Sequence, residues 1–263
     1  MASLDKNDKL RDVKLVSLAS PLSTMNQVTA QGGLEAMIRH ESPAVRFLGW
    51  EGYRLVRLVV LAQGGNAVRT LQQSLARAVV EETSPQVIGQ LMQMMTLPPE
   101  GAGGVSDQTM KAMRQQSWDL AVRQWRAWCV RVASGDEQMA MAAPNGQRML
   151  KRFAEIFPED AQKKNAVLQM VVEMMWAGAE AYDASGARSG EAELLLRESE
   201  SILNALTDKR ERLIEARLNR KPPSGAEVKI GSLDWIQALS DRGVKKPQFD
   251  APATTAPAAT NPS

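Results

Sequence analysis

The chain has 263 residues, of which 44% are hydrophobic and 24% charged, as is ordinary for a globular protein. Its formal net charge of +2 is too small to indicate nucleic-acid binding by itself, and its single cysteine excludes an internal disulfide and a cysteine-based zinc site. Strong helix formers, among them 14 Met, are abundant, whereas β-branched and aromatic runs are few. This composition predicts an all-α fold, with a helical bundle body in one piece or in two lobes and flexible N- and C-terminal arms.

Proline, glycine and polar clusters divide the chain into five expected parts. The clearest division is the stretch TLPPEGAGGVS, which cannot lie inside a helix because two prolines and three glycines fall within it. In chain order the parts are an N-terminal arm (1–14), a first helical lobe (15–95), a Pro/Gly loop (96–106), a second helical lobe (107–221) and a C-terminal arm with a short helix and a disordered tail (222–263).

Helix start signals are clear in the first lobe. Ser42 and Pro43 begin one helix, Asn66 caps the next, and Ser84 with Pro85 begins a third.

The second lobe is expected to begin with a long helix that Ser106 caps. The stretch APNG (143–146) predicts a turn, and a long charged helix is expected over 191–220.

The stretch SWDLAVRQWRAWCVRVASG (117–135) contains three tryptophans, three arginines and the only cysteine. At about 100° per residue, Arg123, Arg126 and Arg131 lie on one side of a helix. This spacing predicts a core helix with an exposed arginine face, and stacking of the tryptophans on bases is the alternative. The expected buried side consists of Trp118, Ala121, Val122, Trp125, Trp128, Cys129 and Val132, with Cys129 as a small hydrophobe and not a nucleophile.

Positive charge is concentrated on either side of the loop. Residues 39–77 hold six arginines against two acids and 110–152 hold eight basic residues against three, whereas 173–200 hold two arginines against seven acids. This pattern fits either ordinary solvated faces or a basic cleft for phosphates, to which the arginine guanidinium is well suited. In the second case, the candidate RNA-binding residues are Arg54, Arg57, Arg123, Arg126 and Arg131.

The sequence carries no catalytic signature. His40 is the only histidine and precedes a helix cap, which is typical of a surface residue and not of a catalytic triad. The stretch GAGG (101–104) lacks the Lys-Ser/Thr ending of a phosphate-binding loop. We therefore expect a protein that is not an enzyme and that uses no metal, no cofactor and no small-molecule substrate.

The C-terminal arm contains one short amphipathic helix, SLDWIQAL (232–239), which has too few apolar residues to form a core alone. This helix docks either on its own domain or in a groove of a neighbouring subunit. The tail that follows it is rich in Pro, Ala and Thr and is expected to be disordered. The candidate subunit-contact residues are Leu233, Trp235, Ile236 and Leu239.

This layout resembles the α-helical coat and nucleocapsid proteins of RNA viruses, namely those of flexible filamentous plant viruses and of some segmented negative-strand viruses. Locally, GVSDQTM (104–110) followed by WRAWCV (125–130) is similar to a potyvirus coat stretch in which an acidic turn precedes a Trp-Cys helix. The resemblance implies a basic groove for single-stranded RNA and terminal arms that link neighbouring subunits.

We therefore expect a viral coat or nucleocapsid type of protein, which binds single-stranded RNA through its phosphates and forms a homo-oligomer through its arms. A helical scaffold or adaptor that binds other proteins is the alternative, indicated by the methionine content and the acidic segment. The N-terminus has no secretory signal, and the longest apolar run is far too short for a membrane span. The expected location is the virion or the host cytoplasm, in soluble form and with no membrane partner.

Overall fold

The computed structural model describes residues 31–98 and 104–249, and these parts contain helices and no strand. The all-α expectation is thereby confirmed, while the N-terminal arm (1–14) and the tail from residue 250 lie outside the described residues. The helices are α2 (Gln31–Ile38), α3 (Pro43–Gln63), α4 (Gly65–Glu81), α5 (Pro85–Met95), α6 (Asp107–Ala133), α7 (Glu137–Ile156), α8 (Ala161–Ala184), α9 (Gly190–Thr207), α10 (Glu215–Leu218), α11 (Gly225–Ala238) and the 3₁₀ turn η2 (Ser240–Arg242).

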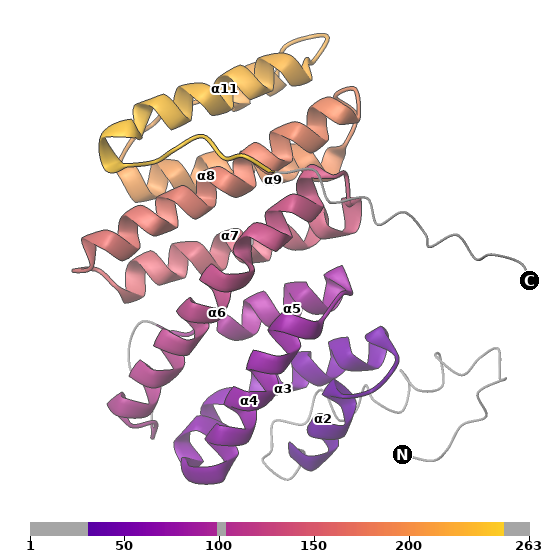
Figure 1. Cartoon of the computed structure of the whole chain (residues 1–263), viewed down its shortest axis with the longest axis vertical. Coiled ribbons are helices and arrows are strands. Elements are labelled where there is room, and N and C mark those ends of the chain that lie inside the picture. Colours follow the sequence, from indigo (N-terminus) through magenta and orange to yellow (C-terminus); the bar gives the residue numbers. More distant parts are fainter. Residues whose placement is uncertain (1–30, 99–103, 250–263) are drawn as a thin grey trace, which may run out of the picture.

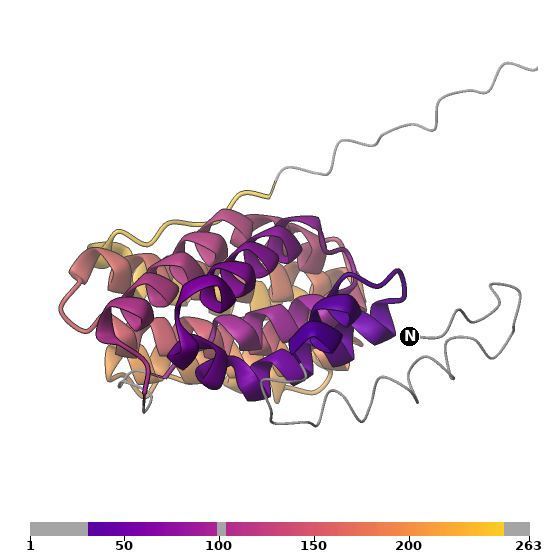
Figure 2. The ribbon, with the colours of Figure 1, turned by 90° about the horizontal axis from the view of Figure 1, so that it is seen from below.

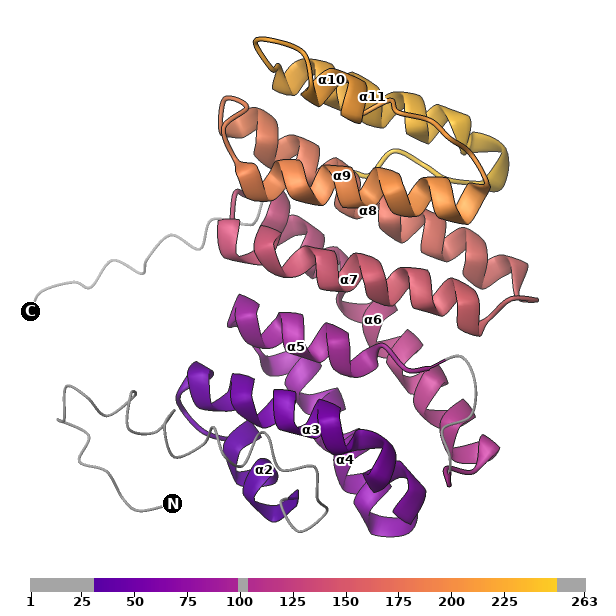
Figure 3. The same ribbon diagram turned by 180° about the vertical axis from the view of Figure 1, so that it is seen from behind.

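The helices form two layers that run along the length of the molecule. In one layer α3, α5, α7 and α9 pack in series, and in the other α4, α6, α8 and α11 do so. Figure 1 shows the second layer in front, and Figure 3 shows the first layer from behind. Successive long helices therefore alternate between the layers, and the chain is a stack of helical hairpins in which each hairpin contacts its neighbours.

A single core runs through this stack, from Leu34 in α2 to Val244 after α11. It crosses the Pro/Gly loop without a break, because α5 packs on α7 and α6 packs on both α4 and α8. Figure 2 views the stack from below, with α2, α3 and α4 nearest. The helices before and after residues 96–106 therefore share one core.

The helix start signals of the first half predict the structure well. Helix α3 begins at Pro43 and α5 begins at Pro85, while α4 begins one residue before the expected cap at Asn66. Ser106 precedes α6, and its hydroxyl oxygen accepts a hydrogen bond from the backbone N–H of Thr109 at 3.2 Å. Local sequence is sufficient at Ser106 because this cap involves only its own turn of helix, whereas Ser42 and Ser84 precede their helices without a side-chain cap bond.

The turn expected at APNG (143–146) is wrong, because α7 continues through it with Pro144 inside the helix. The small residues of this stretch permit close helix packing. A Cβ atom added to Gly146 would lie only 3.0 Å from the ring of Trp125 in α6. Tertiary packing of α7 against α6 thus overrides the local preference for a turn.

The expected single long charged helix is also wrong, because α9 ends before Asp208, whose φ is 55°. The chain then turns back, and the amides of Ile214 and Glu215 donate to the carboxylate of Glu200 at 2.8 and 2.9 Å. The indole N–H of Trp235 donates to the same carboxylate at 2.9 Å. Glu200, only 4% exposed, therefore ties α9, α10 and α11 together.

Candidate interaction surface

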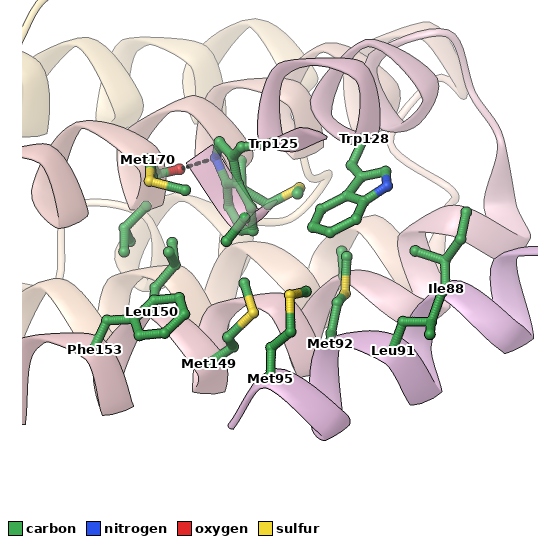
Figure 4. Packing of buried hydrophobic residues seen from close by; sticks show 14 of the residues in the cluster. Ile88, Leu91, Met92, Met95, Trp125, Trp128, Met149, Leu150, Phe153 and Met170 are labelled. Atoms are coloured by element: carbon green, nitrogen blue, oxygen red, sulfur yellow. Dashed lines mark hydrogen bonds between the residues drawn. The ribbon is translucent and has the colours of Figure 1, made fainter. Parts of the chain in front are cut away.

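The tryptophans of α6 lie in the core, as the helical spacing predicts. Trp118, Trp125 and Trp128 are 8%, 1% and 3% exposed, so their rings are not available to stack on bases. The indole N–H of Trp125 donates to the carbonyl of Met170 in α8 at 2.8 Å, and Figure 4 shows Trp125 and Trp128 facing apolar residues of α5 and α7. Cys129 is fully buried, and burial raises the pKa of its thiol, as suits a small core residue.

The outer side of α6 carries Arg123 and Arg126, both of which are exposed. Arg126 donates to the main-chain carbonyl of Gln248 at 2.9 Å. Val122 was expected in the core, but it is 48% exposed, so that placement is wrong. The apolar stripe of α6 is therefore narrower than the helical wheel suggests.

Arg57, a candidate RNA-binding residue, is used inside the fold. Its guanidinium donates to the carbonyls of Gln93, Met94 and Thr96 at the end of α5, over distances of 3.0, 3.0 and 2.9 Å. Burial, together with the like charge of Arg54, lowers the pKa of Arg57 to about 10. Arg57 therefore caps the C-terminal end of α5, where its side chain is partly buried.

Arg131 has a similar structural role at the end of α6. It forms an ion pair with Asp136 at 2.6 Å and donates to the carbonyl of Thr83 at 2.9 Å. Arg54 and Arg57 belong to α3 in one layer, whereas the other three candidate arginines belong to α6 in the opposite layer. The structure therefore does not gather all five arginines on one exposed face.

The C-terminal helix docks on its own body and forms no free arm. Helix α11 packs on α8, and Trp235, Ile236 and Leu239 are 0%, 9% and 1% exposed. Their expected role as exposed subunit contacts is corrected, because they complete the core at the end of the stack. Leu233 alone of the four candidates faces solvent, with 38% of its surface exposed.

After η2 the chain crosses α8 towards α6 as an extended segment, residues 244–249, which we call the strap (Figure 1). The backbone N–H of Lys245 donates to Oε1 of Gln169 in α8 at 2.8 Å, and Nε2 of Gln169 donates back to the carbonyl of Lys245 at 3.1 Å. The Arg126 bond to the carbonyl of Gln248 adds a second point of attachment. Side chains of two helices thus hold the main chain of the strap.

Side chains of the strap add apolar and cationic contacts. Val244 is 4% exposed, Pro247 is buried, and Phe249 packs against the core. The ammonium of Lys246 lies 4.7 Å from the ring centroid of Trp176, a cation–π contact. The surface of α6 and α8 beneath the strap, which we call the α6–α8 face, therefore accepts an extended chain with apolar anchors and a cation.

The sequence does not predict the strap, because the tail after the short C-terminal helix is expected to be disordered. Its apolar residues Val244, Pro247 and Phe249 are the available signal within a polar stretch. Gln169 carries no such signal, because a helical Gln is most often a solvated surface residue, and the sequence predicts Arg126 as a partner of phosphate and not of a main-chain carbonyl.

A hollow of about 490 Å³ lies between α2, α3 and α4, and Trp50 is part of its lining. Arg46 binds Glu82 there through two hydrogen bonds of 2.7 and 2.8 Å. His40 also lines the hollow, and its Nδ1 accepts the backbone N–H of Ser42 at 3.0 Å. These contacts join the start of α3 to the end of α4, which is a structural role.

Over 31–98 and 104–249, no group of three or more His, Cys, Asp or Glu side chains is placed to hold a metal ion. Within the same ranges, no helix is both long enough and apolar enough to cross the bilayer.

The fold and the α6–α8 face define an all-α helical bundle in two layers, which carries an extended segment on one layer. No family model, no curated protein and no solved structure matches the chain. The resemblance to viral coat proteins therefore remains a prediction.

Proposed function

We propose that this chain is a non-enzymatic helical scaffold that binds protein segments in extended conformation across the surface of its hairpin stack. The observation that carries the proposal is the strap, an extended segment that Gln169 and Arg126 hold by its main chain. Stacked helical hairpins typically offer broad surfaces for partner proteins. Main-chain hydrogen bonds supply affinity in such recognition, and anchoring side chains supply specificity.

Coating of single-stranded RNA is the second candidate, and the exposed side chains of Arg123 and Arg126 favour it. Phosphate contacts, however, need accessible guanidinium groups. The guanidinium groups of Arg57 and Arg131 instead bind carbonyl and carboxylate groups of the chain itself. Self-assembly and residence in a virion belong to this second candidate. We therefore rank it below the scaffold.

Selection from a random-peptide display library against the full chain tests the scaffold proposal, with filter binding of single-stranded RNA run in parallel. The proposal predicts enrichment of peptides that share a sequence pattern, together with little retention of RNA. If no peptide is enriched and RNA is retained with an affinity that falls steeply as salt rises, the scaffold proposal is wrong and the RNA-binding function replaces it.

A further inference from the structure

We propose that the strap is an internal ligand, which occupies in cis the site that receives a segment of a partner protein. The segment that fits has a cation, a proline, any residue and an aromatic residue in that order, as in Lys246 to Phe249. This inference rests on the proposed scaffold function and adds to it the binding site, the sequence class of the partner and its competition with the strap.

The main-chain contacts favour a site for exchangeable segments. Gln169 bonds both the N–H and the carbonyl of Lys245, and Arg126 bonds the carbonyl of Gln248. Each of these bonds is to a main-chain group of the strap. Any extended segment can therefore form them, whichever side chains it directs towards solvent. The side chains of Lys245 and Gln248 are in fact exposed, and they leave the sequence free at those positions.

The inward side chains define what the partner must carry. Pro247 is buried and its ring restricts the chain to an extended form, which lowers the entropy lost on binding. Phe249 packs against the core, and Lys246 lies over the ring of Trp176. Glu173, one turn from both Gln169 and Trp176, accepts a hydrogen bond from Gln169 and places a carboxylate on the same face, where Arg126 also lies.

The strap can leave the face without unfolding the helix before it. Helix α11 has its own anchor in Trp235, which is fully buried and bonded to Glu200. Gly243, with φ at 78°, separates η2 from the strap. Because the strap is tethered, it competes as a ligand at an effective concentration on the order of millimolar, so a free peptide binds poorly until the strap is displaced.

The test uses the full chain with two substitutions in the strap, Pro247→Asp and Phe249→Asp, which remove its anchors. The probe is the fluorescein-labelled peptide GVKKPQF, residues 243–249, followed by fluorescence anisotropy. The control probe is GVKKDQD, which carries the same two substitutions. A third protein adds Gln169→Ala and Arg126→Ala to the strap variant, and circular dichroism confirms the fold of all proteins.

We expect the strap variant to bind GVKKPQF at least about tenfold more tightly than the wild type does, because the cis competitor is gone. Adding the substitutions at Gln169 and Arg126 should remove that gain, and GVKKDQD should bind no protein. A folded strap variant that binds GVKKPQF no better than the wild type would overturn the inference and leave the strap a structural element. Concentration-dependent dimerisation of the wild type that the strap variant lacks would also overturn it, because a second copy would then be the occupant.

A second measurement covers the case in which the strap variant fails to fold. Gln248→Cys adds an exposed thiol, and the natural cysteine, Cys129, is buried, so an environment-sensitive dye labels only the strap. Unlabelled GVKKPQF, added above the strap's effective concentration of about a millimolar, should release the labelled strap in the full chain, and GVKKDQD should not. Equal signals with the two peptides would contradict the inference. Enrichment of peptides unrelated to GVKKPQF in the display selection would still support the scaffold function. The inference about the strap can therefore be wrong while the scaffold function holds.

Discussion

The side-chain amide of Gln169 binds the main chain of Lys245 in both directions, donating to its carbonyl at 3.1 Å and accepting from its N–H at 2.8 Å. Two opposed residues of an antiparallel sheet exchange the same pair of bonds, one to an N–H and one to a carbonyl. A helix has no free main-chain groups along its side, because they are bonded within the helix itself. A side-chain amide on α8 therefore supplies what an all-helical surface otherwise lacks, a partner for extended chain.

Removal of that amide should loosen the strap. For Gln169→Ala, we expect the backbone amide of Lys245 to exchange with solvent at least about tenfold faster, since the two hydrogen bonds between Gln169 and Lys245 are lost, at about 1 kcal/mol each. Hydrogen exchange followed by mass spectrometry measures this on the C-terminal peptides. Gln138→Ala, an exposed glutamine of α7, is the control and should change nothing there. Unchanged exchange in Gln169→Ala would show that this amide does not hold the strap.

Substitutions on the buried side of α6 should lower stability far more than substitutions on its exposed side. Trp125→Ala is expected to cost about 3–5 kcal/mol of unfolding free energy, because a fully buried ring is lost and the Met170 carbonyl loses its donor. Arg123→Ala on the exposed side should change stability by less than about 0.5 kcal/mol. Urea unfolding measures both values. A stable Trp125→Ala protein would refute the core assignment of α6.

Glu200 is expected to be the most sensitive acidic residue of the stack. Glu200→Gln should cost about 3 kcal/mol, because an amide cannot accept from the N–H groups of Ile214, Glu215 and Trp235 together. The matched control is Glu198→Gln, which breaks only the partly exposed 3.6 Å pair with Arg148 and should cost less than about 1 kcal/mol. Thermal unfolding compares the two, and similar costs would contradict the linking role of Glu200.

Acid should weaken the junction between α3 and the end of α4. Burial raises the pKa of Glu82, but the bonds from Arg46 and from the amides of Ser84 and Thr83 outweigh it and hold the pKa below its ordinary value of 4.5. The stabilisation is therefore present above 4.5 and is lost as the pH falls through the lower folded pKa. Urea unfolding across this range should show a smaller acid loss in Arg46→Met.

The control for that titration is Arg77→Met, which removes an exposed ion pair with Glu81 on α4. Solvent screens such a pair, so the variant should follow the wild-type pH dependence closely. If Arg46→Met and Arg77→Met lose stability with acid in the same way as the wild type, the Arg46 bonds do not stabilise the ionised form of Glu82.

The parts of the fold that the sequence predicts are those fixed by short-range chemistry. Ser106 caps its own helix, and the spacing of Trp118, Trp125 and Trp128 places them on one side of it, so both features can be read locally. The turn expected at APNG fails because the packing of Gly146 against Trp125 depends on a different helix. A local pattern carries no information on such a contact.

The candidate site was less predictable for the same reason. Arg57 and its acceptor Thr96 are 39 positions apart in the chain, and Gln169 and Lys245 are 76 apart. Charge counts alone cannot tell an arginine that caps a distant helix from one that faces solvent. The hairpin stack likewise has no convincing sequence repeat, because the packing of alternate helices needs only apolar faces and not repeated residues.

The most direct test of the scaffold function is a salt series of binding, with GVKKPQF as the ligand of the strap variant, Pro247→Asp with Phe249→Asp, and single-stranded RNA as the ligand of the wild type. Our account predicts peptide binding that weakens only modestly with salt, since it rests on main-chain bonds and apolar anchors, and little binding of RNA. RNA binding that falls steeply with salt, with no binding of the peptide, would contradict it.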